Sequence, residues 1–163
     1  MAIPGYARAM PKDPHPELRP ADASDSGDLL AWRNDPETRA NSRSTGPVDA
    51  ATHHAWLTHA LADPNRRLWV AEAGGAKVGT LSVVRLDDGR AEFSITVAPT
   101  WRGRGIGVAM LRVGVAESRR LWPGAPLLAW IRSTNTASCR LFERCGFRLL
   151  GEEAEFRRYG VEP

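Results

Sequence analysis

Arg102-Gly103-Arg104-Gly105-Ile106-Gly107 lies where a strand-like pattern of residues gives way to a helical one. Three glycines in six residues let the main chain bend so that several backbone N–H groups converge on one point. Because a helical pattern begins inside the stretch, the positive end of the helix dipole faces the same point. The stretch therefore predicts a phosphate-binding loop between a strand and a helix.

Two well-known phosphate-binding motifs do not fit this loop. A Walker A loop ends in Gly-Lys-Ser/Thr, but the last lysine of the chain is Lys77. A dinucleotide-binding fingerprint needs small residues at fixed spacing and an acidic residue after the next strand. Position 110 is Met, and the next strand pattern ends at Ile131-Arg132. What remains is the pattern Arg-x-x-Gly-x-Gly.

The residues before the loop predict an antiparallel meander. Strand patterns at 68–73, 77–85 and 91–97 are joined by Gly74-Gly75 and Asp87-Asp88-Gly89, which are tight-turn sequences. Further toward the N-terminus we expect a strand at 17–19, a helix from Ser24 or Asp25 through Trp32, a loop from Asn34 to Pro47 and a helix at 49–62.

The residues after the loop predict a parallel pair of strands. A helical pattern runs from 106 to about 121 and leads to an apolar strand at 127–131. A strand, helix and strand in this order form a crossover unit, so the strands near 91–97 and 127–131 are expected to be parallel and adjacent. The overall class is mixed α/β. The chain is expected to finish with a helix at 136–145 closed by Gly146, and strands at 148–150 and 155–161.

Length and composition predict one domain. The chain has 163 residues, of which 42% are hydrophobic and 25% charged. The proline-rich residues 1–16 are expected to form a flexible leader before a single domain at 17–163. The apolar runs fall far short of the ~20 residues of a spanning helix, so we expect a cytoplasmic protein with no membrane partner. Cys139 and Cys145 are expected to be free thiols.

Basic residues are concentrated after the glycine loop begins. Residues 101–163 carry 11 basic and 6 acidic side chains, against 11 and 13 in residues 1–100. This bias favours an anionic ligand, either a phosphate-bearing cofactor or nucleic acid. Aromatic residues are not interleaved with the basic ones and no nucleic-acid motif is present, so we expect no nucleic-acid partner.

A second block, Asn135-Thr136-Ala137-Ser138-Cys139-Arg140-Leu141-Phe142-Glu143-Arg144-Cys145-Gly146-Phe147, follows the loop after about 28 residues. Together the two blocks resemble the GNAT acyltransferase superfamily, and the resemblance extends from about residue 17 to 161. It implies a mostly antiparallel sheet whose central parallel strands splay apart, flanked by helices. It also implies direct transfer of an acetyl group from acetyl-CoA to a primary amine, with no metal.

The resemblance implies where coenzyme A binds. The backbone amides of the loop would hold its pyrophosphate, and its pantetheine arm would lie between the splayed strands. Arg140 and Arg144 would reach the phosphates or serve only as solvated surface. The implied cofactor residues are Arg102, Gly103, Arg104, Gly105, Ile106 and Gly107 in the loop, Ile95 and Val97 on the strand, and Asn135, Ser138 and Phe142 on the helix.

The resemblance also suggests catalytic groups. Glu92 is the first candidate for the base, acting through water; the alternative is that it faces solvent on an alternating strand. His53 and His54 are further candidates. Phe142 stands where many family members have a tyrosine that protonates the departing thiolate. The acid is therefore open among water, Ser138 and Tyr159.

The acceptor is suggested by a narrower resemblance. Trp32-Arg33-Asn34-Asp35-Pro36, His53-x-x-Trp56 and Ala91-Glu92-Phe93-Ser94-Ile95 resemble a branch that includes nucleotide-linked amino-sugar and ribosomal-protein N-acetyltransferases. Trp32 and Trp56 would stack on a sugar or base, with His53 beside them, and Arg33 would bind a phosphate, unless both tryptophans belong to the core. We expect a small-molecule amine, an amino-sugar nucleotide, and a monomer or homodimer. The alternatives are a peptide N-terminus, or a non-catalytic module that binds CoA or nucleic acid.

Overall fold

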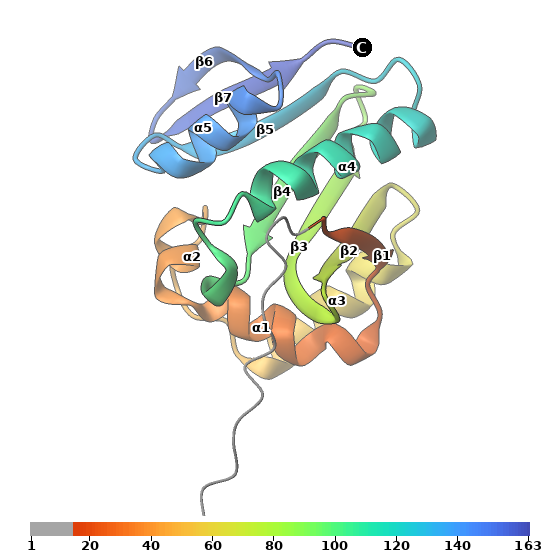
Figure 1. Ribbon diagram of the computed structural model, residues 1–163, viewed down its shortest axis with the longest axis vertical. Coiled ribbons are helices and arrows are strands. Elements are labelled where there is room, and N and C mark those ends of the chain that lie inside the picture. The colour runs from red at the N-terminus through yellow and green to blue at the C-terminus, as the bar shows by residue number, and fades with distance from the viewer. Residues whose placement is uncertain (1–14) are drawn as a thin grey trace, which may run out of the picture.

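Within residues 15–163, seven strands form one sheet at the centre of the protein, in the order β1-β2-β3-β4-β5-β7-β6. The computed structural model describes residues 15–163, so the predicted leader lies almost wholly outside the described residues (Figure 1). The elements are β1 (Glu17–Pro20), η1 (Ala23–Asp25), α1 (Ser26–Asn34), α2 (Pro36–Asn41), α3 (Ala50–Ala62), β2 (Arg66–Ala73), β3 (Ala76–Arg85), β4 (Ala91–Val97), η2 (Pro99–Trp101), α4 (Ile106–Leu121), β5 (Leu127–Arg132), α5 (Thr136–Arg144), β6 (Arg148–Glu153) and β7 (Phe156–Val161), where η marks a 3-10 helix.

The sheet has the mixed topology that the sequence predicts. β1 to β4 are antiparallel neighbours, and β5, β7 and β6 form a second antiparallel group. The two groups meet at β4 and β5, which are parallel. The predicted meander and the predicted parallel pair are therefore confirmed.

Helices cover both faces of the sheet. Side chains along a strand alternate between the two faces, so each face has side chains that pack against helices. Leu81 of β3 and Phe93 of β4 face α4, where they lie against Gly114. The neighbouring Thr80 and Ser82 face the opposite side, toward α1 and α3. The helix α4 thus lies on one face and α1 with α3 on the other (Figure 1).

The end of α5 and the two cysteines agree with the sequence. Gly146 has φ +89°, the left-handed conformation expected of a residue that closes a helix. Cys139 is buried, Cys145 is partly buried, and neither forms a disulfide. No helix within residues 15–163 combines the length and apolar character that crossing a membrane requires.

The predicted loop between Asn34 and Pro47 is wrong in its first part, where the short helix α2 forms. The carboxylate of Asp35 accepts a hydrogen bond from the Thr38 amide at 3.0 Å, and Pro36 occupies the first helical position. A residue before proline does end a helix, as it ends α1. The same proline favours the start of another, because its fixed φ suits that position.

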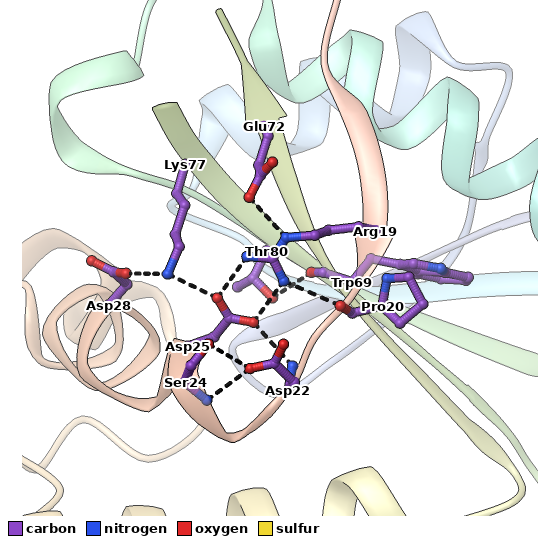
Figure 2. A network of polar contacts seen from close by, with 10 residues as sticks. All are labelled: Arg19, Pro20, Asp22, Ser24, Asp25, Asp28, Trp69, Glu72, Lys77 and Thr80. Atoms are coloured by element: carbon purple, nitrogen blue, oxygen red, sulfur yellow. Dashed lines mark hydrogen bonds and ion pairs between the residues drawn. The ribbon is translucent and has the colours of Figure 1, made fainter. Parts of the chain in front are cut away.

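The predicted cap of the first helix is right in position for Asp25, which is the N-cap residue of α1, but the Asp25 side chain makes no capping hydrogen bond. Asp22 caps the 3-10 turn that leads into α1. The Asp25 carboxylate is fully buried and accepts two hydrogen bonds of 2.8 Å from Arg19 (Figure 2). Lys77 of β3 lies 2.9 Å from the same carboxylate. These hydrogen bonds, that of Arg19 first, hold the pKa of Asp25 well below its usual range.

Candidate functional site

The two central strands separate soon after they begin. β4 and β5 pair only at Ala91 with Leu127 and at Glu92 with Leu128. The Ala91 amide donates to Pro126 at 2.9 Å, so Ala91 directs its N–H toward β5. Beyond Glu92 the strands diverge (Figure 1), and both line a cleft of about 830 Å³. The splayed parallel strands implied by the family resemblance are present.

The edge of β4 that faces this cleft carries free backbone groups. Ala98 donates to Val78 of β3 at 2.8 Å, and hydrogen-bonded positions alternate along an antiparallel pair. The N–H groups of Ile95 and Val97 therefore point away from β3, into the gap that β5 has left. Within the sheet they have no partner, so they are available to a ligand with amide-like groups.

The glycine loop closes the end of the cleft where β4 ends. Gly103 and Gly105 have φ +72° and +76°, a region that side chains rarely adopt. A Cβ on Gly107 would collide with Leu141 of α5, so this glycine lets α4 and α5 approach closely. Within residues 15–163, no amide from 103 to 108 donates a hydrogen bond to another protein group. The loop thus presents several free N–H groups at the start of a 16-residue helix.

The α5 helix forms the opposite wall. Ser138 and Phe142 lie one turn apart and both line the cleft, as do Arg140 and Arg144. Asn135 lines it too, but its side-chain oxygen accepts the Ser138 amide at 3.1 Å and so caps α5. Of the predicted cofactor residues all line the cleft except Arg104, whose guanidinium stacks on the Trp101 ring at 5.4 Å.

The Arg102 side chain binds the protein itself. Its guanidinium donates to Asp35 at 2.8 Å, to Glu37 at 2.9 Å and to Thr38 at 2.9 Å. All three partners belong to α2 or its cap, which the sequence did not predict. Arg102 therefore connects α2 to the glycine loop. It lines the cleft, but its charge is already paired with carboxylates of the protein.

Glu92 lies at the last paired position of β4, where the cleft begins to open. Its side chain is 30% exposed and lies 3.2 Å from Arg43, which is 63% exposed. A displaceable partner of this kind leaves the carboxylate accessible from the cleft. Arg43 also lies over the rings of Trp130 and Phe156.

A second cavity, of about 370 Å³, lies on the α1 and α3 side of the sheet. The four predicted acceptor residues, Trp32, Arg33, His53 and Trp56, all line it. Trp32 and His53 are buried, whereas Trp56 is 43% exposed. Trp32 thus belongs to the core and to a cavity wall at once.

Comparison with known proteins agrees with this geometry. Residues 17–148 match the acetyltransferase (GNAT) domain family. The L-methionine sulfoximine/L-methionine sulfone acetyltransferase of Pseudomonas aeruginosa is 31% identical over 142 residues, which are 83% of this chain and 81% of that protein. The chain belongs to the GNAT acetyltransferases.

Solved structures share the GNAT fold. The spermidine N-acetyltransferase of Vibrio cholerae, in complex with CoA and spermine, has a TM-score of 0.82 at 17% identity and covers 91% of this chain and 95% of its own. The ribosomal-protein-alanine N-acetyltransferase of Brucella melitensis has a TM-score of 0.74 at 27% identity, covering 90% and 99%. The protein is an N-acetyltransferase that uses acetyl-CoA, so a non-catalytic module is not supported.

The residues of the cleft fit this cofactor. The free amides of 103–108 match a pyrophosphate, and the unpaired edge of Ile95 and Val97 matches the amides of a pantetheine arm. Both face one continuous cleft. When bound, acetyl-CoA supplies the acetyl group as a thioester.

The structure narrows the candidates for the acid. Tyr159 is 1% exposed, its hydroxyl donates to Glu143 at 3.0 Å, and it does not line the cleft. Burial and its neighbours Cys139 and Glu143 raise the pKa of Tyr159. Tyr159 is therefore no longer a candidate for the acid that protonates the thiolate, and Ser138 and water remain as candidates.

The candidates for the base lie in different places. Glu92 lines the cleft and His53 lines the second cavity, whereas His54 lines neither. Burial lowers the pKa of His53 and so favours the neutral form of its imidazole. Only Glu92 lies beside the gap between the splayed strands.

Sequence reasoning missed the residues at the open end of the cleft. Arg132 donates to Ser42 at 2.9 Å and to Glu155 at 2.6 Å, and its Nε is buried without a partner among residues 15–163. The Asp35-Pro36 pair would have signalled α2, and with it part of this wall. The other lining residues missed here are Glu37, Thr38, Asn41, Arg43, Trp130 and Phe156.

Proposed function

We propose that this enzyme acetylates the primary amine of a small acceptor that carries an anionic group. The observation that supports the proposal is the make-up of the cleft, which combines the free backbone amides of the glycine loop with arginine and glutamate side chains. Arg33, Arg43 and Arg132 line the cleft together with Glu37 and Glu92. An acceptor with both an amine and an anion matches this pattern of charge.

In the proposed reaction each group has one task. The Val97 N–H, which has no partner in the sheet, donates a hydrogen bond to the carbonyl oxygen that becomes negative. Glu92 takes the ammonium proton through a water molecule, which makes the amine nucleophilic. A proton for the departing thiolate comes from Ser138 or from water. Because both reactants are held close together in one cleft, a large part of the rate enhancement comes from their proximity and orientation.

Three kinds of acceptor are candidates. The resemblance of the N-terminal half favours a nucleotide-linked amino-sugar, with a peptide N-terminus as its alternative. The curated relative from Pseudomonas aeruginosa acts on methionine sulfoximine and methionine sulfone, which favours a free amino acid. The absence of a nucleic-acid partner, a cytoplasmic location and a monomeric or dimeric state remain predictions from the sequence.

A thermal-shift titration followed by a thiol-release assay tests the proposal. Acetyl-CoA and free CoA should each raise the melting temperature in a saturable manner, because they bind only the folded protein. Release of CoA thiol should then depend on an amine from a panel of amino-sugar nucleotides, peptides and free amino acids. A saturable shift without amine-dependent release from any member would contradict the proposed transfer and leave the cofactor site intact.

A further inference from the structure

The exposed surface of the second cavity is mostly apolar, although polar side chains line it as well. Its apolar side chains come from α1, from α3 and the chain before it, and from β2. Its volume, about 370 Å³, is near the lower end of the range for small-ligand sites. The apolar members are Leu29, Trp32, Val48, Trp56 and Leu68.

The second cavity and the cofactor cleft share three lining residues, Arg33, Ser94 and Thr96. Ser94 and Thr96 alternate with Ile95 and Val97 along β4, so their side chains stand on the opposite face from those of the cofactor-facing residues. Glu92 continues the same row. A ligand in the second cavity would therefore reach the row that leads to the candidate base.

Arg33 is the cation at the boundary between the two spaces. Its Nη2 donates to the Ser44 carbonyl at 2.8 Å. Its Nη1 is buried and has no hydrogen-bond partner among residues 15–163. Within the same residues no carboxylate lies within ion-pair distance of Arg33. A buried guanidinium nitrogen with nothing to donate to is an uncompensated group that an anionic ligand would satisfy.

The other polar groups of the second cavity already have partners or carry no charge. Arg66 donates to the Ser82 hydroxyl at 3.1 Å and lies 3.9 Å from Asp63. His53 lies 3.5 Å from the Ser26 hydroxyl. Arg33 is thus the group in this cavity with an open position for an anion.

We propose that the acceptor is an α-amino carboxylate, whose neutral side chain fills the second cavity and whose carboxylate binds Arg33. Its amine then lies over the row of Glu92, Ser94 and Thr96, of which Ser94 and Thr96 line both the second cavity and the cofactor cleft. This inference rests on the proposed acetyl transfer and specifies its substrate class. A nucleotide-linked amino-sugar is too large for such a cavity, and a peptide lacks a free carboxylate beside its amine.

Kinetics with matched amines test the inference. L-Leucine and L-methionine are compared with L-leucinamide and L-methioninamide, in which a neutral amide replaces the carboxylate that Arg33 would bind. The free acids should give a kcat/KM about tenfold or more above the amides, the loss expected when a charge-assisted hydrogen bond is removed. Equal values for acids and amides would overturn the inference, as would turnover confined to amino-sugar nucleotides or peptides.

Variants locate the effect. Arg33→Gln should raise the KM for the free amino acids about tenfold. The KM for the amino-acid amides and the thermal shift induced by CoA should both stay the same. Arg33→Lys should retain part of the preference for free acids over amides. Arg39→Gln is the matched control, because Arg39 also donates to a backbone carbonyl of the same loop, that of Thr45 at 3.0 Å, but lines neither cavity, and it should keep the preference. Binding of L-leucine to the CoA complex, measured by calorimetry, gives a readout independent of turnover and should weaken in Arg33→Gln but not in Arg39→Gln. A panel without any amine-dependent thiol release would overturn the proposed function itself, whereas release without a carboxylate preference overturns only this inference.

Discussion

Polar groups are concentrated in two regions of this molecule, which differ in whether those groups have hydrogen-bond partners within the protein. Around Asp25 the protein supplies a partner for every polar atom of the carboxylate, from Arg19, Lys77 and the Asp22 amide (Figure 2). Along the gap between β4 and β5 it leaves the amides of 103–108 and a nitrogen of Arg33 without one. The first region is complete in the chain alone, whereas the second is completed by ligands.

Polar groups that have partners within the protein serve its stability, whereas the unpartnered groups of the cleft are available to ligands. A buried group that lacks a partner costs free energy, and a bound ligand that supplies the partner recovers that cost. The Asp25 cluster joins β1, the start of α1 and β3, and its loss should lower the stability of the protein without changing the ligand sites. The gap between the strands should show the reverse, with lost binding and retained stability.

Asp25→Ala is expected to have the largest effect. It leaves Arg19 and Lys77 without their shared carboxylate and should lower the free energy of unfolding by about 3 kcal/mol or more. Urea unfolding measures the loss, and the CoA affinity of the fraction that remains folded should be normal. Asp28→Ala is the control, because Asp28 is an exposed partner of the same Lys77 and its loss should cost about 1 kcal/mol or less.

The acid sensitivity of stability should follow the same carboxylate. The folded pKa of Asp25 is lowered, so its stabilisation is present above the unfolded pKa of about 3.9 and is lost as pH falls below it. Wild-type stability should thus decline on acidification below about pH 4 more steeply than that of Asp25→Asn. Parallel pH curves for the two proteins would mean that Asp25 does not carry this dependence.

Gly105→Val should abolish most of the cofactor affinity. Gly105 has φ +76°, and no atom beyond Gly105 and its two chain neighbours lies within 4 Å of the point that a Cβ would occupy, so the variant strains the loop and redirects its amides without a collision. Losing two hydrogen bonds to charged oxygens, at about 1.5 kcal/mol or more each, raises the Kd for CoA about 100-fold. Calorimetric titration measures the change.

Gly89→Val separates strain from binding. Gly89 has φ +83° and equal free space, but it lies in the turn between β3 and β4, away from the cleft. Gly89→Val should introduce a similar backbone strain and keep the affinity for CoA. If both variants bound CoA normally, the assignment of the glycine loop would be wrong.

The sequence predicts those parts of the molecule whose signal is local. Alternating apolar residues, glycine turns and the glycine loop itself give β2 to β5, α4 and α5 within a few residues. The partners of Arg102 and Asp25 could not be predicted in this way, because a charged side chain does not specify which distant carboxylate or cation it meets. Arg102 binds Asp35 across 67 positions, and Asp25 binds Lys77 of β3.

The acceptor region shows the same limit. A resemblance groups Trp32, Arg33, His53 and Trp56, and the structure gathers them around one cavity. The unpartnered nitrogen of Arg33 depends on how α1 meets the chain near Ser44. No spacing in the sequence encodes that fit, so the charge preference of the site emerges only in three dimensions.

Glu92→Gln should affect the rate rather than binding. Removing a general base lowers kcat by about 100-fold or more, roughly 2.7 kcal/mol, whereas the Kd for CoA should stay the same because Gln fills the same space. Stopped-time thiol release gives kcat, and Glu92→Asp should recover part of it. Glu117→Gln, at an exposed pair with Arg120 on α4, is the control. A fully active Glu92→Gln would assign the carboxylate to the surface pair with Arg43.

Phe142→Tyr should have the smallest effect, because a thiol with a pKa of about 8.5 leaves without much assistance. Phe142 is 2% exposed, packs edge-on against Phe147 and lines the cleft one turn from Ser138. A hydroxyl added to its ring would restore the proton donor that the family resemblance implies here, and kcat should rise about two- to threefold, a change below 1 kcal/mol.

The double variant decides what serves as the donor in the native enzyme. If Ser138 protonates the thiolate, Ser138→Ala should lower kcat and Phe142→Tyr should restore it in the same chain, a coupling that rate measurements on the four proteins of the cycle would detect. If water is the donor, Ser138→Ala should leave kcat unchanged and the two substitutions should act independently. If Ser138 is the donor, its hydroxyl joins the amides of 103–108 and the nitrogen of Arg33 as a polar group that a ligand, and not the protein, completes.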